Sequence, residues 1–324
     1  MDIYKQTLHY LFTLNHFAEW PELRQLTQKA ADNRPSSWQL PLYSCLAVGG
    51  YPEQALPGVA ALACAHLSII MIDDLLDADP RGVHHQLGTP QTANLAAALQ
   101  AASLEALTQV AQQNNDHTLL SSFNNMLLST TYGQHLDIYN PADEVTYWRV
   151  VQTKSAPFFR EALYIGASLG QATKPVIQQI GQLGALYGEM IQINDDIHDT
   201  LEVPANPDWT LGRYPLPLLY AHIVAYPDKD RFTQLRQAVT TNTAALNEAQ
   251  LILLRSGAIS YAVAELLNRH KRAQTLLNEI NLVERTYLEQ LFEGMIQPVY
   301  ALLEIAQAQP LPPELANGRV LGDG

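Results

Sequence analysis

The sequence predicts an all-α protein, built as a single-domain bundle of about ten helices. Apolar residues recur at three- and four-residue spacing over long windows, as on the buried face of a helix. Alanine, leucine and glutamine, which favour helix, are frequent in these windows. The alternation of apolar and polar residues that is typical of strands is nearly absent. With 324 residues, 47% of them hydrophobic, the chain is long enough to bury one large core.

The expected helices follow one another along the chain and are separated by glycine and proline. The windows with helical periodicity are residues 53–77, 91–113, 117–136, 144–169, 174–199, 214–225, 231–256, 258–278 and 282–308. Gly49, Gly50 and Pro52 precede the first window, and Gly88 with Pro90 precede the second. We expect the domain to occupy residues 1–308 and the proline-rich residues 309–324 to form a flexible tail.

Composition limits the possible partners and the location of the protein. The net charge is −13, which argues against a nucleic-acid partner, since that would require a basic face. Cys45 and Cys64 stand in apolar surroundings and predict a reducing compartment without disulfides. The N-terminus does not resemble a signal peptide, and no apolar run approaches the roughly 20 residues of a transmembrane helix. We therefore expect a cytoplasmic protein.

Two acidic clusters have the same form, DDxxD, and they are the strongest indication of the chemistry of this protein. DDLLD occupies residues 73–77 and DDIHD occupies residues 195–199, and each ends an apolar helical window. Residues four apart lie on one face of a helix, so each motif forms a carboxylate clamp. A single acidic run is usually solvated surface, but two clamps at the ends of apolar helices predict a shared site. Like charges crowded in this way need cations, and carboxylate oxygens suit Mg²⁺ shared with phosphate groups. The expected metal-binding residues are Asp73, Asp74, Asp77, Asp195, Asp196 and Asp199.

Further elements around these motifs resemble the trans-isoprenyl diphosphate synthase (polyprenyl synthetase) family. GQHLDI at residues 133–138 is similar to the family's GQxxD element, and KSAPFF at 154–159 resembles its lysine-bearing KT element. LGRYPLPLL at 211–219 resembles the GKxTLPL element, with arginine in the lysine position. The segment at 49–66 resembles the family sequence before the first motif. The resemblance implies an isoprenoid synthase type of bundle with a central active-site cavity.

The resemblance also implies a reaction and roles for its residues. An allylic prenyl diphosphate loses its diphosphate to Mg²⁺, with three ions held by the two motifs. Basic side chains and a glutamine surround the leaving group, and the candidates are Lys154, Arg81, Arg213 and Gln192. The prenyl tail occupies a hydrophobic tunnel. Ser68 and Ile69 stand about one turn before the first motif, where small residues leave room for a product of C20 or longer, and Phe158 is a candidate for a side chain that plugs this space.

The chain departs from the family where the second substrate, isopentenyl diphosphate, binds. The family uses a basic GGKRxRP loop, a histidine before the first motif and an arginine pair after it. Here the loop region retains Arg34, the histidine position holds His66, and the arginine pair is reduced to Arg81. Three readings therefore remain open: elongation of an allylic diphosphate with isopentenyl diphosphate, cyclisation of a prenyl diphosphate by a class I terpene synthase, and a non-catalytic subunit of a heteromeric synthase. The resemblance also implies a homodimer.

Overall fold

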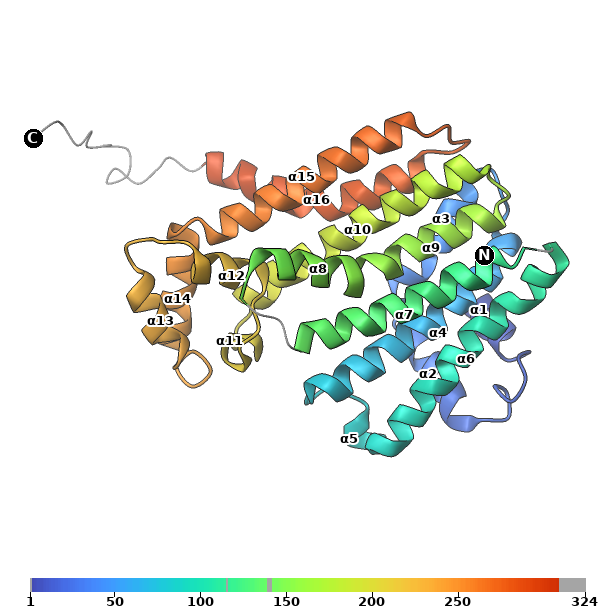
Figure 1. Ribbon diagram of the computed structural model, residues 1–324, viewed down its shortest axis with the longest axis horizontal. Helices are drawn as coiled ribbons and strands as arrows, with labels where there is room; N and C mark the ends of the chain where they lie inside the picture. The colour runs from blue at the N-terminus through green and yellow to red at the C-terminus, as the bar shows by residue number, and fades with distance from the viewer. Residues whose placement is uncertain (1, 115, 139–141, 309–324) are drawn as a thin grey trace, which may run out of the picture.

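A computed structural model describes residues 2–114, 116–138 and 142–308, and over these residues it contains helices and no strand (Figure 1). The predicted all-α fold is confirmed. The tail expected at residues 309–324 lies outside the described residues. The first half contains α1 (Ile3–Leu11), α2 (Pro21–Asp32), the 3₁₀ helix η1 (Ser36–Gln39), α3 (Leu40–Ala47), α4 (Pro52–Asp77), α5 (His84–Leu87), α6 (Thr89–Asn114) and α7 (Thr118–Ile138). The second half contains α8 (Glu144–Lys154), α9 (Ala156–Leu169), α10 (Lys174–Leu201), α11 (Asp208–Leu211), α12 (Leu216–Ile223), α13 (Lys229–Arg236), α14 (Thr243–Arg255), α15 (Ala258–Glu279) and α16 (Thr286–Ala308).

Helix α10 lies in the middle of the bundle, between α9 and the pair α15 and α16 (Figure 1). Its glycines bring it close to α9. A Cβ added at Gly184 would lie 2.3 Å from the carbonyl oxygen of Phe159, and one at Gly188 would lie 2.8 Å from the Cα of Ala156. Larger residues at these positions would force the two helices apart. The close approach carries α10 past the start of α9, so that the second acidic motif lies beside α8, where Tyr147 contacts Asp196.

Helix α4 carries the first acidic motif and is apolar around most of its circumference. Pro52 occupies its first turn, and the Gln54 side-chain oxygen accepts a hydrogen bond from the backbone N–H of Tyr51 at 2.7 Å. Length and composition alone would allow α4 to span a membrane, with a mean hydropathy of 2.0, but 61% of that apolar window is buried inside the bundle. Helices α3, α6 and α9 pack against it, as expected of a central core helix. That the chain contains no membrane span stays a prediction.

The structure divides two windows that the sequence pattern predicts as continuous. The window 144–169 breaks at Ser155, because Pro157 has no N–H to donate to the carbonyl of Thr153, which interrupts the helical hydrogen bonds there. The window 231–256 breaks between α13 and α14, and the Asn242 side chain caps the new helix. Helices also form before residue 52, where we predicted none. α1 and α3 are only nine and eight residues long, so their apolar faces span few turns.

The described hydrophobic core has a main part, a cluster around Trp38 between α1, α3 and α4, and a smaller cluster at one end of the molecule. The main part runs through α4, α6, α7, α9 and α10. The smaller cluster is formed by α11 to α14 and includes Trp209, Leu218 and Phe232. These helices lie together at one end of the bundle (Figure 1). They support the loop that carries Arg213, described below.

A buried carboxyl group on α9 predicts that stability falls as pH rises. Glu161 is 1% exposed, accepts a hydrogen bond from Ser122 at 2.7 Å, and its Oε1 has no hydrogen-bond partner. Burial raises its pKa from 4.5 to about 7. Between these values the folded state binds a proton that the unfolded state has released. Its stabilisation is therefore complete below pH 4.5 and is lost as pH rises to about 7, up to roughly 3 kcal/mol.

The Glu161→Gln variant should remove this dependence, because an uncharged amide can still accept the Ser122 hydrogen bond. We expect it to melt at a higher temperature than the wild type at pH 8 and to differ little at pH 5. Thermal unfolding followed by circular dichroism at both pH values measures this. Exposed Glu279→Gln is the control. An equal shift of the wild-type and Glu161→Gln curves between pH 5 and 8 would contradict the prediction.

Candidate active site

Both acidic motifs face one cavity of about 370 Å³ in the middle of the bundle. Side chains from α4, α7, α8, α9 and α10 line it, together with the segment between α10 and α12. The carboxylates in its wall are Asp73, Asp77, Asp137, Asp195, Asp196, Asp199 and Asp208. Among the predicted metal-binding residues, Asp74 lies next to this wall but does not line it. The structure therefore brings the two clamps together, as the paired motifs predict.

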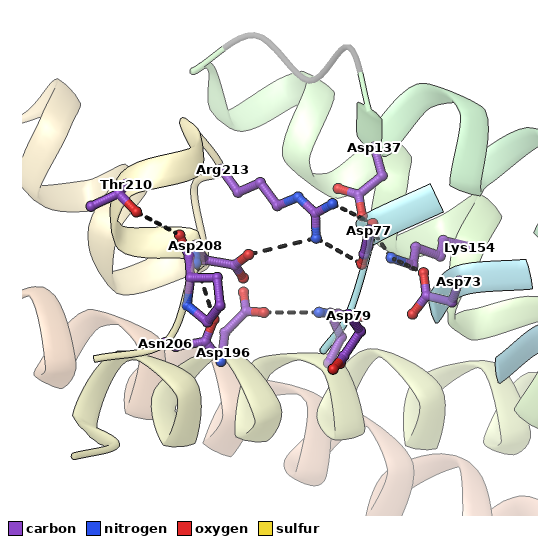
Figure 2. A network of polar contacts seen from close by, with 12 residues as sticks. Asp73, Asp77, Asp79, Asp137, Lys154, Asp196, Asn206, Asp208, Thr210 and Arg213 are labelled. Atoms are coloured by element: carbon purple, nitrogen blue, oxygen red, sulfur yellow. Dashed lines mark hydrogen bonds and ion pairs between the residues drawn. The ribbon is translucent and has the colours of Figure 1, made fainter. Parts of the chain in front are cut away.

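Two basic side chains neutralise the first motif (Figure 2). Lys154 Nζ lies 2.6 Å from Asp137 Oδ2 and 3.4 Å from Asp73 Oδ1. Arg213 reaches across the cavity from the segment before α12 and donates two hydrogen bonds to the Asp77 carboxylate, one from Nη1 at 2.8 Å. Its Nη1 also lies 3.6 Å from Asp208 Oδ1. The cations predicted from the KT and GKxTLPL elements thus lie at the metal-binding end of the cavity.

Both burial and neighbouring charges shift the pKa values of the groups at this end of the cavity. Burial raises the pKa of Asp73, and Lys154 opposes this shift. Burial would lower the pKa of Lys154, but the Asp137 and Asp73 carboxylates raise it, so the ammonium stays charged. In the second motif, burial and the neighbouring Asp199 raise the pKa of Asp195 to about 6. These carboxylates are crowded and partly desolvated, and a bound cation would stabilise them.

Asp196 differs from the other carboxylates because three protein donors surround it. The Tyr147 hydroxyl donates to Oδ2 at 2.7 Å, and the backbone N–H of Leu216 donates to the same oxygen at 2.7 Å. Gln192 Nε2 donates to Oδ1 at 2.8 Å, and its own carbonyl oxygen accepts from Ser155. Although we predicted Asp196 as a metal ligand, these bonds engage both of its oxygens. The structure instead places it as a support that ties α8, α10 and α12 together.

The donor set of the cavity fits magnesium ions that are shared with a ligand. Asp73 Oδ1 is buried without a hydrogen-bond partner, although Lys154 is close, so one carboxylate oxygen is left for a cation. Among the described side chains, no three histidine, cysteine or acidic groups lie close enough to enclose a metal by themselves. Mg²⁺ commonly binds through one or two carboxylates together with waters and substrate phosphates. Asp73, Asp77, Asp195 and Asp199 would hold such ions here.

The opposite end of the cavity is more apolar. Ile69 and Ile70 on α4, Phe158 and Phe159 on α9, and Ile191 on α10 line it. Ile69 and Phe158 are therefore placed as the tunnel prediction requires. Ser68 is not, because it is fully buried and its hydroxyl donates to the carbonyl oxygen of Ala96 on α6 at 2.9 Å. The predicted role of Ser68 in the tunnel is corrected: it holds two helices together.

The three residues expected to bind the second diphosphate are dispersed. His66 lines the cavity. Arg34 forms an ion pair with Asp2 at 3.2 Å, and Arg81 pairs with Asp79 at 3.0 Å. Both arginine side chains are largely exposed, at 59% and 80%, and neither lines the cavity. The structure thus places His66 in the wall of the cavity with the acidic motifs, whereas Arg34 and Arg81 lie outside it.

Three site residues carry no role in the sequence prediction. Asp137 lies within the quoted GQHLDI element and binds Lys154. Asp208 and Tyr147 support Arg213 and Asp196 respectively. The final aspartate of the GQxxD pattern is Asp137, and this is a usable signal for the first. Nothing local marks Tyr147, because its partner Asp196 is 49 residues away. Asp208 is close to Arg213 in the sequence but belongs to none of the elements quoted above.

Arg236 connects the smaller core cluster to the mouth of the cavity. From α13, its Nε donates to the carbonyl oxygen of Trp209 at 2.8 Å and its Nη2 to that of Arg213 at 3.1 Å. Its guanidinium also lies 4.7 Å from the centre of the Tyr214 ring. The segment 209–214, which presents Arg213 to Asp77, is therefore held from α13.

Comparison with known proteins places the chain among enzymes of isoprenoid synthesis. The family model for polyprenyl synthetases matches residues 23–253. A short chain isoprenyl diphosphate synthase of Methanothermobacter thermautotrophicus is 27% identical over 259 residues, covering 75% of this chain and 78% of the relative. A geranylgeranyl diphosphate synthase of Saccharolobus solfataricus is 28% identical over 162 residues, with 46% and 49% covered. The crystal structure of a decaprenyl diphosphate synthase from Rhodobacter capsulatus has the same fold, with a TM-score of 0.78 over 92% of this chain and 95% of that chain at 16% identity.

Proposed function

The chain belongs to the polyprenyl synthetase family, and from this premise we propose that it is a Mg²⁺-dependent prenyltransferase. It would ionise an allylic prenyl diphosphate and condense it with isopentenyl diphosphate to give a longer polyprenyl diphosphate. One observation carries the proposal: two acidic motifs from α4 and α10 face one cavity, and Lys154 and Arg213 contact the first of them. The names of the relatives as diphosphate synthases favour elongation over cyclisation.

The residues at the metal-binding end would act on the leaving diphosphate. Bound Mg²⁺, three ions in the family pattern, would neutralise the charge that develops as the carbon–oxygen bond breaks. Binding of metal ions by Asp73 and Asp77 would release Lys154 and Arg213 from these carboxylates. The two basic side chains would then donate hydrogen bonds to phosphate oxygens. Asp196 would hold Gln192 in place, and Gln192 would present its carbonyl dipole near the allylic carbon.

The apolar end would exclude water and hold the prenyl tail. Ile69, Phe158 and Ile191 make most of that part of the wall apolar, with His66 beside Phe158 as its polar exception. A dry pocket protects the allylic cation from premature capture by water. Both acidic motifs are complete, which supports a catalytic chain over a non-catalytic subunit. We also propose a cytoplasmic homodimer, in keeping with the family resemblance.

Incubation with farnesyl diphosphate and ¹⁴C-labelled isopentenyl diphosphate tests this function. We expect the label in a longer prenyl diphosphate in the presence of Mg²⁺ and none after chelation. An unlabelled hydrocarbon or alcohol that forms from farnesyl diphosphate alone would instead indicate a terpene synthase. Unchanged substrates under all conditions would support the non-catalytic subunit.

Enlarging Ile69 should shorten the product. Its side chain lines the cavity one turn before Asp73, so the Ile69→Phe ring would occupy space that a long tail needs. We expect the main product to lose at least one five-carbon unit, measured by chromatography of the dephosphorylated products. Ile72→Phe is the matched control, because Ile72 is on the same helix but does not line the cavity. An unchanged product in Ile69→Phe would show that the tail follows another wall.

A further inference from the structure

His66 is held in one protonation state by a tryptophan from another part of the chain. Trp38 lies on η1, is fully buried, and its indole Nε1 donates to His66 Nδ1 at 3.2 Å. An indole nitrogen can only donate a hydrogen bond, so Nδ1 of His66 must accept one. Nδ1 therefore carries no hydrogen while this bond exists. The hydrogen of the neutral imidazole is then on Nε2, the other ring nitrogen.

The surroundings of His66 also favour the neutral ring. The Phe158 ring lies 5.6 Å away, centre to centre, and burial lowers the pKa of His66 to about 4. Protonation would place a second hydrogen on Nδ1, facing the indole N–H, and would break the only hydrogen bond that the described structure gives this ring. His66 nevertheless lines the cavity, so the ring has a polar edge to offer to a ligand.

The family resemblance implies that this histidine position meets the second diphosphate, and its place along α4 agrees with that. His66 stands seven residues before Asp73, two turns away on the same face of the helix, or roughly 10 Å along its axis. It therefore lies away from the metal-binding mouth, where the allylic diphosphate would bind. A ligand group that His66 can recognise must accept a hydrogen bond without a metal ion. A phosphate oxygen is a strong acceptor of this kind.

We propose that Trp38 is a positioning residue that fixes the tautomer of His66, so that a neutral Nε2–H donates to the metal-free diphosphate of the acceptor substrate. The proposal rests on the proposed function and adds a residue to it. Arg34 and Arg81 are paired with aspartates outside the cavity, so the neutral donor of His66 supplies a larger share of the hydrogen bonding to this diphosphate. Recognition by a tautomer-locked histidine does not depend on a positive charge at position 66.

Nitrogen NMR of the protein with ¹⁵N-labelled histidine tests the tautomer directly. We expect wild-type His66 to show a protonated Nε2 and an unprotonated Nδ1 at pH 7, with the signal assigned by its loss in His66→Gln. In Trp38→Phe the lock is removed, and the two nitrogen shifts should move toward each other as the tautomers mix. A wild-type His66 that carries its hydrogen on Nδ1, or on both nitrogens, would overturn the proposal. This measurement requires no variant of Trp38 to fold and no turnover.

Kinetics separate positioning from packing. Trp38→Phe should raise the KM for isopentenyl diphosphate about two- to tenfold, the effect of one hydrogen bond, with a smaller change in kcat. A glutamine side chain donates without any choice of tautomer. In the His66→Gln background, therefore, Trp38→Phe should have little further effect on that KM. Equal losses in both backgrounds would show that Trp38 only fills space.

Two controls complete the experiment. Trp20→Phe makes the same change in a side chain that packs against the core outside the cavity and should leave both KM values unchanged. The KM for the allylic substrate should not respond to Trp38→Phe. If no label from isopentenyl diphosphate is incorporated by the wild type, the proposed function fails, whereas the NMR spectrum still decides whether Trp38 sets the state of His66.

Discussion

Replacing Asp73 with asparagine should reduce kcat/KM by on the order of 10²–10³, the loss observed when one stabilising contact to a developing charge is removed. Asp73 has a buried oxygen without a hydrogen-bond partner, faces the cavity, and is the carboxylate of the first motif nearest to Lys154. An amide has the same shape but binds Mg²⁺ weakly, so the metal dependence should shift to higher Mg²⁺ concentration.

Steady-state rates across a Mg²⁺ titration measure this effect, with circular dichroism to check the fold. The matched control is Asp32→Asn, an exposed aspartate at the end of α2, which should behave like the wild type. Asp195→Asn should show a loss similar to Asp73→Asn from the opposite clamp. Full turnover in both cavity variants would exclude catalysis through the two motifs.

Replacing Lys154 with glutamine should impair both catalysis and stability in the absence of metal. The ammonium lies between Asp137 and Asp73, and its removal leaves two partly buried carboxylates without their cation. We expect kcat to fall by on the order of 10²–10³ because the leaving diphosphate loses a charged donor. We expect the stability of the metal-free protein to fall by about 1–3 kcal/mol because the carboxylates lose their partner.

Thermal unfolding with and without Mg²⁺ separates the two effects. Added Mg²⁺ should raise the melting temperature of Lys154→Gln more than that of the wild type, since the ion then meets carboxylates that lack a competing ammonium. Lys174→Gln, at the exposed start of α10, should show neither effect. A metal response equal to that of the wild type would mean that Lys154 and Mg²⁺ do not share these carboxylates.

Much of this architecture could be predicted from the sequence, because the signals were periodic or repeated. The apolar period of α4 and α10 predicted long central helices, and the repetition of DDxxD predicted that their ends meet. The same period extends through Ser155 and hid the break between α8 and α9, although Pro157 marks it. Position in the motif also suggested metal binding for Asp196, whereas donors from Tyr147 and Leu216, 49 and 20 residues away, engage its oxygens.

Side-chain direction accounts for the other differences. Ser68 and Ile69 are neighbours in the sequence, and the rotation of about 100° per residue turns one toward α6 and the other into the cavity. Arg34 and Arg81 are in loop positions whose sequence suggests phosphate binding. Each instead forms an ion pair with an aspartate outside the cavity, Arg34 with Asp2 and Arg81 with Asp79.

The hydrogen bonds from Arg236 to the backbone of the segment 209–214 link the stability of α11 to α14 to the position of Arg213 in the cavity. The small cluster of α11 to α14 contains far fewer buried residues than the main core, so we expect it to open on warming before the long helices do. Its opening would release the carbonyls that Arg236 holds and withdraw Arg213 from Asp77 while the long helices remain intact. Heat-sensitive variants in α13 or α14 would then lose turnover at temperatures where helix content is still native. A survey that records activity alone would mistake them for active-site mutants.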